Sequence, residues 1–190
     1  MSVADERDLV IHAQRGDVEA FGELVRRHQS AVYNVAYRMT GNRHDAEDLA
    51  QEAFLRAFRA FDRFDPDRPL GPWLKRITAN LCLNQLQSSR MKTTSVVTDM
   101  HFPGQETITM DSYAQSRPLP EQTVIRRETA DQIRAAILQL SPHYRAVIEL
   151  RHFQNLSYDE MAASLGRPLS SVKSDLFRAR KQLAELLSNW

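Results

Sequence analysis

Apolar side chains recur at helical spacing along most of the chain. Between residues 5 and 40 they form two apolar faces that break at Gly16-Asp17, and Thr40-Gly41-Asn42 is typical of a helix end. Further helices are predicted from about Asn42 to Phe61, from Trp73 to Arg90, and from Glu121 onward. The pattern therefore predicts an all-α protein.

One stretch lacks this periodicity. Residues 91–120 show no sustained apolar repeat and are rich in Thr, Ser, Pro and Gly, which is typical of a flexible linker. The sequence thus predicts two small helical domains, residues 1–92 and 121–190, joined by a linker at 93–120.

The C-terminal stretch predicts two successive helices joined by a tight turn. Ser157 and Glu160 have capping-box spacing, and Gly166 suits the turn. The second helix has one apolar face, made of Val172, Leu176, Ala179, Leu183 and Leu186, and its other faces are largely basic. A short buried helix followed by a long, basic, half-exposed one is the layout of a DNA-binding helix-turn-helix. A helical hairpin with a solvated charged face would give the same pattern.

The helix before it, beginning at Ser141-Pro142, is also predicted to be amphipathic. Pro is favoured in a first turn after an N-cap serine, and the helix is expected to bury Tyr144, Val147, Ile148 and Phe153.

Composition limits the possible functions. The 190-residue chain is 26% charged with a net charge of +1, so binding to nucleic acid would have to come from local basic patches. The single cysteine, Cys82, excludes an internal disulfide and a multi-cysteine metal site. No signal peptide and no membrane-spanning stretch is predicted, so we expect a soluble, cytoplasmic protein without membrane insertion.

An acidic stripe marks the helix predicted at 42–61. Asp45, Asp48 and Glu52 share one face, which suits the N-terminal half of a helix because the helix dipole favours negative charge there. The same carboxylates would also be the ligands of a metal site in a helical enzyme, although no second acidic cluster accompanies them. No metal and no cofactor is predicted.

Aromatic and amide side chains gather in the loop 61–72 and the helix after it. Phe61, Phe64 and Trp73 could stack on unpaired bases, and Asn80 and Asn84 could pair with base edges. The alternative is that the aromatic rings are core and the amides are merely solvated.

Three short motifs carry a resemblance to a known family. Ser157-Tyr158-Asp159-Glu160, Val172-Lys173-Ser174 and Arg178-Ala179-Arg180 resemble the C-terminal domain of bacterial extracytoplasmic-function (ECF) sigma factors. The resemblance extends over nearly the whole chain. It implies a transcription initiation factor, not an enzyme, that binds the beta-prime clamp and beta flap of core RNA polymerase and promoter DNA. It also implies control by an anti-sigma factor, in a stress response.

The resemblance also implies three sets of site residues. The polymerase-docking set comprises Asp45, Glu47, Asp48, Gln51, Glu52 and Phe54. The set for the melted minus-ten strand comprises Phe64, Trp73, Lys75, Arg76, Asn80 and Asn84, with the loop offering a pocket for an extruded base. The set for the minus-thirty-five duplex comprises Ser171, Lys173, Ser174, Phe177, Arg178, Arg180 and Lys181.

Two positions depart from the family pattern. Ser170-Ser171 stand where Gly-Thr is frequent, and Asp175 stands where a basic residue is frequent. Asp175 could accept a hydrogen bond from a cytosine amino group, but we favour a surface pair with Arg178 or another neighbour of Ala179. Two rival functions remain: a conventional helix-turn-helix regulator that acts without polymerase, and a metal enzyme that uses the acidic stripe.

Overall fold

The computed structural model describes residues 5–93 and 120–188, and these residues are almost entirely helical. The helices are α1 (Glu6–Gln14), α2 (Val18–Thr40), α3 (Arg43–Arg59), α4 (Leu70–Thr93), α5 (Pro120–Gln139), α6 (Pro142–Ile148), α7 (Tyr158–Leu165) and α8 (Leu169–Ser188), with a 3-10 turn at Phe61–Arg63 and a π-helical turn at Glu149–Phe153. No strand occurs in these two ranges, so the all-α prediction is confirmed. The predicted linker lies almost wholly outside them.

Local signals set the ends of the first helices where the sequence predicted them. Asp17 caps α2, its Oδ1 accepting hydrogen bonds from the backbone N–H groups of Glu19 and Ala20, each at 3.0 Å. Gly41 ends α2 in the left-handed conformation (φ 71°), where a side chain would also collide with Leu138. Asn42 then caps α3.

Two predictions about helices need correction. The loop predicted at 61–72 is shorter, because α4 begins at Leu70 and Pro72 occupies its first turn, where a missing N–H breaks no helical hydrogen bond. Phe153, predicted to be buried, is 41% exposed. The π-helical turn at Glu149–Phe153 changes the register of the side chains, and the ring of Phe153 lies instead under the guanidinium of Arg38.

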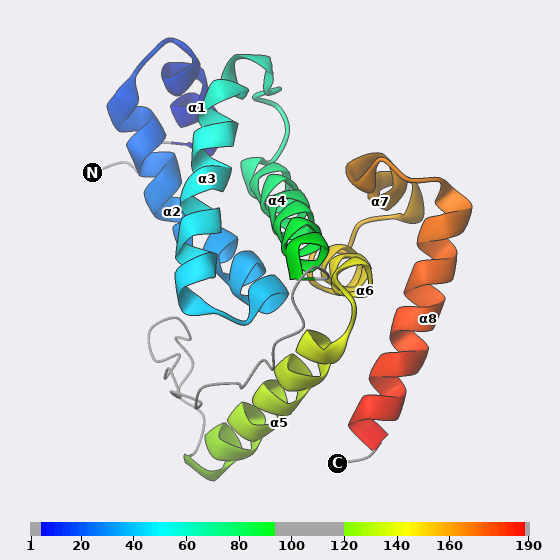
Figure 1. Ribbon diagram of the computed structural model, residues 1–190. Helices are drawn as coiled ribbons and strands as arrows, with labels where there is room; N and C mark the ends of the chain where they lie inside the picture. The colour runs from blue at the N-terminus through cyan, green and yellow to red at the C-terminus, as the bar shows by residue number, and fades with distance from the viewer. Residues whose placement is uncertain (1–4, 94–119, 189–190) are drawn as a thin grey trace.

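The first four helices form one bundle and the last four a second, with α4 lying between α3 and the α6–α7 pair, and α8 on the far side of that pair (Figure 1). Small residues allow α3 to approach its neighbours closely, since Ala46, Ala53 and Ala57 are fully buried. The exact limits of the two domains remain a prediction.

The two bundles share buried surface. Val35 of α2 and Ala79 of α4 belong to the same apolar cluster as Leu140, Val147 and Met161 of the C-terminal bundle. Arg38 of α2 adds a bidentate ion pair to Glu149, with both nitrogen–oxygen distances at 2.8 Å. The two bundles are therefore in direct contact in this structure.

Candidate nucleic-acid interface

The α7–α8 turn has the predicted capping geometry. The backbone N–H of Ser157 donates to Glu160 Oε2 at 2.8 Å, and the backbone N–H of Glu160 donates back to Ser157 Oγ at 3.3 Å. Ser157 Oγ also donates to Glu160 Oε2 at 2.9 Å, and the two bonds that Ser157 donates from its backbone and side chain hold the pKa of the Glu160 carboxyl below its usual value. Gly166 ends α7 at φ 61°, a conformation that glycine adopts without strain. The helix-turn-helix geometry is thus confirmed.

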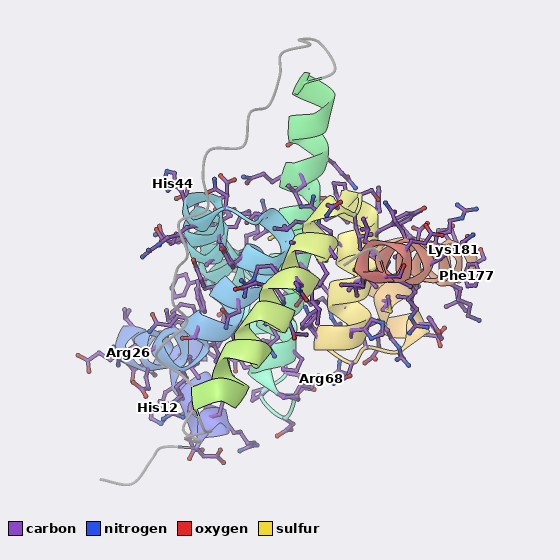
Figure 2. The ribbon with its side chains drawn as sticks, turned by 90° about the horizontal axis from the view of Figure 1, so that it is seen from below. His12, Arg26, His44, Arg68, Phe177 and Lys181 are labelled. Atoms are coloured by element: carbon purple, nitrogen blue, oxygen red, sulfur yellow. The ribbon has the colours of Figure 1, made fainter. Side chains whose placement is uncertain are left out.

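Helix α8 divides into a buried face and an exposed face. Val172, Leu176 and Ala179 are buried, whereas Phe177 is 71% exposed. Phe177 and Lys181 project from α8 away from the rest of the molecule (Figure 2). The other members of the predicted minus-thirty-five set are exposed at Lys173, Arg178 and Arg180, and half-buried at Ser171 and Ser174. An exposed phenylalanine ring can contact a thymine methyl group in a major groove, and basic side chains beside it can bind phosphates.

Two of the basic side chains on this face already have neighbours. Lys173 Nζ lies 5.7 Å from the centre of the Tyr158 ring, and Arg180 Nε donates to His152 Nε2 at 3.2 Å. Burial, and then the charges of Arg180 and Arg151, lower the pKa of His152, which favours the neutral ring that can accept this bond.

Asp175 forms an ion pair with Arg167, which lies in the turn between α7 and α8. The prediction of an ion pair is confirmed, but its predicted partners on α8 were wrong. Arg167 Nη1 also lies 3.4 Å from Nδ1 of His143, whose Nε2 is 2.9 Å from the amide nitrogen of Gln87 on α4. Asp175 therefore helps to hold the turn between α7 and α8.

The predicted minus-ten residues lie on α4 and in the loop before it, and they differ in accessibility. Phe64 is only 7% exposed, and its ring packs 4.7 Å, centre to centre, from that of the half-buried Trp73. Asn80 Nδ2 donates to the backbone carbonyl of Ser164 in α7 at 2.8 Å. Lys75 and Arg76 are half-buried and Asn84 is exposed. Phe64 thus supports Trp73, and Asn80 faces the second bundle.

The acidic side of α3 is solvent-accessible and partly paired within its own helix. Glu47 accepts from Arg43 at 2.9 Å and Glu52 from Arg56 at 2.8 Å. The rest of the predicted docking set is exposed at Asp48 and Gln51 and half-buried at Asp45 and Phe54. Two apolar side chains on the same helix, Leu55 and Phe58, are not part of the predicted docking set, and they are 53% and 52% exposed.

Other kinds of site find no support in the described part of the chain. There, no three His, Cys, Asp or Glu side chains lie close enough together to hold a metal ion. Over the same ranges, no helix is long and apolar enough to cross a membrane. Cys82 is fully buried, and burial raises the pKa of its thiol to about 12.

The fold and the exposed face of α8 define a helix-turn-helix DNA-binding protein. Residues 24–91 match the family model of Sigma-70 region 2, and residues 130–183 match that of Sigma-70, region 4. The chain is 37% identical over 175 residues to the ECF RNA polymerase sigma factor SigW of Bacillus subtilis, covering 92% of each. It is 33% identical over 175 residues to the ECF RNA polymerase sigma-E factor of Escherichia coli K12, covering 92% of this chain and 90% of that one.

A solved structure is also similar: the sigma factor RpoE in complex with the anti-sigma factor NepR from Bartonella quintana. It has a TM-score of 0.62 and 26% sequence identity, with 90% of this chain and 98% of that chain covered. The chain therefore belongs to the ECF sigma factors of RNA polymerase, which are transcription initiation factors and not enzymes.

Proposed function

We propose that this sigma factor uses three separate surfaces during initiation. The acidic and apolar side of α3 docks on the beta-prime clamp of core polymerase, the loop 61–69 with α4 holds the melted minus-ten strand, and α8 reads the minus-thirty-five duplex. The observation that carries the proposal is the exposure of Phe177 on the basic side of a helix whose opposite side is buried. Such a ring gains little from folding, whereas it can contact a thymine methyl group in a major groove.

On α8, residues would divide by role. Lys173, Ser174, Phe177 and Arg178 would face base edges, while Ser171, Arg180 and Lys181 would meet phosphates. Phosphate contacts add affinity and salt dependence but little sequence preference. The bond from Arg180 to His152 fixes the guanidinium beside the helix before any DNA is present.

On the N-terminal bundle, Asp45, Glu47, Asp48, Gln51, Glu52 and Phe54 would form the docking surface, extended by Leu55 and Phe58. The ion pairs of Glu47 and Glu52 within α3 are exposed and contribute little stability, so both carboxylates can exchange their partners for basic groups of polymerase. Trp73, Lys75, Arg76, Asn80 and Asn84 would hold the opened strand, with Phe64 supporting Trp73 from the core.

We further propose that an anti-sigma factor binds this protein and restrains it in a stress response, as the RpoE–NepR complex suggests. Because sigma factors act on RNA polymerase and promoter DNA, we expect the protein to work in the cytoplasm. The beta flap of polymerase would contact the C-terminal bundle.

The test is in vitro transcription on a genomic fragment library, with core polymerase alone or with the protein added. Sequencing the 5′ ends should give a small set of start sites that share two upstream elements and depend on the added protein. The variant Glu52→Lys should lose these starts without losing duplex binding through α8. Starts that are unchanged by the protein would contradict the proposal, and duplex binding without core polymerase binding would favour a conventional regulator.

A further inference from the structure

Helix α1 holds the first half of the loop that joins α3 to α4. Gln14, at the end of α1, donates through Nε2 to two backbone carbonyls of that loop, to Phe61 O at 3.0 Å and to Phe64 O at 2.7 Å. Both loop residues are buried, at 3% and 7% exposed. One amide group therefore fixes the spacing between two carbonyls three residues apart.

The same helix also holds the other end of the loop. Glu6 Oε1 accepts from the backbone N–H of Leu70, the first residue of α4, at 3.2 Å, and Glu6 Oε2 lies 3.0 Å from His28 Nε2. The His28 ring in turn packs close to Gly71. The first backbone N–H groups of a helix have no acceptor within that helix. Here Glu6 of α1, which is distant in sequence, supplies an acceptor for one of them.

Between these two anchors lies an exposed segment. Asp65, Asp67, Arg68 and Pro69 are exposed, while Phe64 behind them is packed against Trp73. Arg68 lies at the surface (Figure 2). The match to Sigma-70 region 2 begins only at residue 24, so it does not include α1.

We infer that α1 is a clasp, in which Gln14 and Glu6 are positioning residues that hold the loop 61–69 in the shape that receives an extruded minus-ten base. The inference rests on the proposed function of this loop. A loose loop would have to be ordered when the base enters, at the expense of affinity, whereas a loop fixed at both ends has already been ordered by folding.

The experiment measures how strongly holoenzyme selects the base that enters the pocket. Polymerase holoenzyme is assembled with the full-length protein and titrated with a fluorescent single strand that carries the minus-ten element. The same strand is then tested with an abasic site at each position in turn. Stacking and edge bonds in a pocket give about tenfold tighter binding of the intact strand at the pocket position.

Gln14→Leu removes both donors at similar size. Holoenzyme with this variant should bind the intact strand about tenfold more weakly than wild type does. Its affinity should then fall by less than twofold further when the abasic strand replaces the intact one. Gln29→Leu makes the same chemical change on an exposed position of α2 and should behave as wild type. Gln14→Lys keeps N–H donors and should restore the ratio of intact-strand to abasic-strand affinity. The added charge affects both strands alike, so its effect cancels in this ratio. Glu6→Ala releases the other end of the loop and should lower the same ratio, even if Gln14→Leu folds poorly.

The outcomes separate this inference from the proposed function. If wild-type holoenzyme does not prefer the minus-ten strand to a scrambled strand, the proposed function fails. If it does, but Gln14→Leu and Glu6→Ala keep the full tenfold abasic penalty, α1 does not position the loop and the clasp is refuted. Core polymerase affinity should be unchanged in all variants.

Discussion

Replacing Arg38 by Met removes one half of the ion pair between the two bundles. The guanidinium of Arg38 reaches across from α2 and donates to both carboxylate oxygens of Glu149 at 2.8 Å. The partners differ in burial, because the Glu149 side chain is 3% exposed and that of Arg38 is 26% exposed. Methionine keeps much of the length of the side chain, so the substitution mainly tests the charge.

The difference in burial sets the size of the effect. Without Arg38, the Glu149 carboxylate would remain in the interior, where the Gln154 amide donates a long hydrogen bond to it at 3.4 Å. Removing one partner of a buried pair costs ~3–5 kcal/mol, and the partial exposure of Arg38 places the loss at the lower end, about 3 kcal/mol. That is a large part of a typical domain's stability.

Removing Glu149 instead should cost much less. In Glu149→Gln, Arg38 can turn toward water, and it keeps the Phe153 ring, whose centre lies 4.4 Å from the guanidinium carbon. We expect a loss of about 1 kcal/mol. The double variant Arg38→Met/Glu149→Gln leaves no unpaired buried charge and should therefore be more stable than Arg38→Met alone.

Urea unfolding of the full-length protein, followed by circular dichroism, measures these differences. Arg26→Met is the matched control on the same helix, since Arg26 pairs with Glu23 in an exposed position and should cost less than about 0.5 kcal/mol. The reasoning is refuted if Glu149→Gln is as destabilised as Arg38→Met, or if the double variant is the least stable of the three.

Three further predictions concern single side chains. Phe177→Ala should lower affinity for a duplex carrying the minus-thirty-five element about tenfold with an unchanged Tm, because its ring is 71% exposed; a large drop in Tm would place the ring in the core instead. Cys82 should resist alkylation at pH 8 until urea unfolds the protein, because burial raises the pKa of its thiol to about 12; rapid labelling of the native protein would contradict this. Ser157→Ala should cost about 1 kcal/mol at pH 7, measured by urea unfolding. Because Ser157 lowers the pKa of Glu160 from 4.5, that difference is fully present above pH 4.5 and should shrink as the pH falls through the lowered value; a pH-independent difference would exclude this linkage.

The helix-turn-helix could be predicted from sequence because its determinants are local. The capping box lies within four residues, Gly166 marks the turn, and the buried face of α8 repeats at helical spacing. The ion pair of Asp175 could not be assigned correctly, since Arg167 lies eight residues earlier and on the other side of the helix start. Helical spacing relates residues within one helix only.

Contacts between distant segments left no periodic signal in the sequence. Arg38 and Glu149 are 111 residues apart, and Gln14 meets Phe64 across 50 residues. In the sequence, a single arginine or glutamine near the end of an amphipathic helix cannot be distinguished from an ordinary solvent-exposed residue. Only the packing of α2 on the C-terminal bundle, and of α1 on the loop, reveals what these side chains bind.

The contact between the bundles also bears on how the minus-ten strand could be held. Asn80 donates to the Ser164 carbonyl of α7, and Gln87 on the same helix lies 2.9 Å from His143 of α6. A base edge that pairs with both the oxygen and the nitrogen of an Asn amide needs that amide in one plane with the base and clear of other chains. With α7 packed on α4, Asn80 cannot meet that requirement. Strand capture through Asn80 therefore requires the two bundles to separate, so the energy that holds Arg38 to Glu149 opposes this capture until polymerase or promoter contacts exceed it.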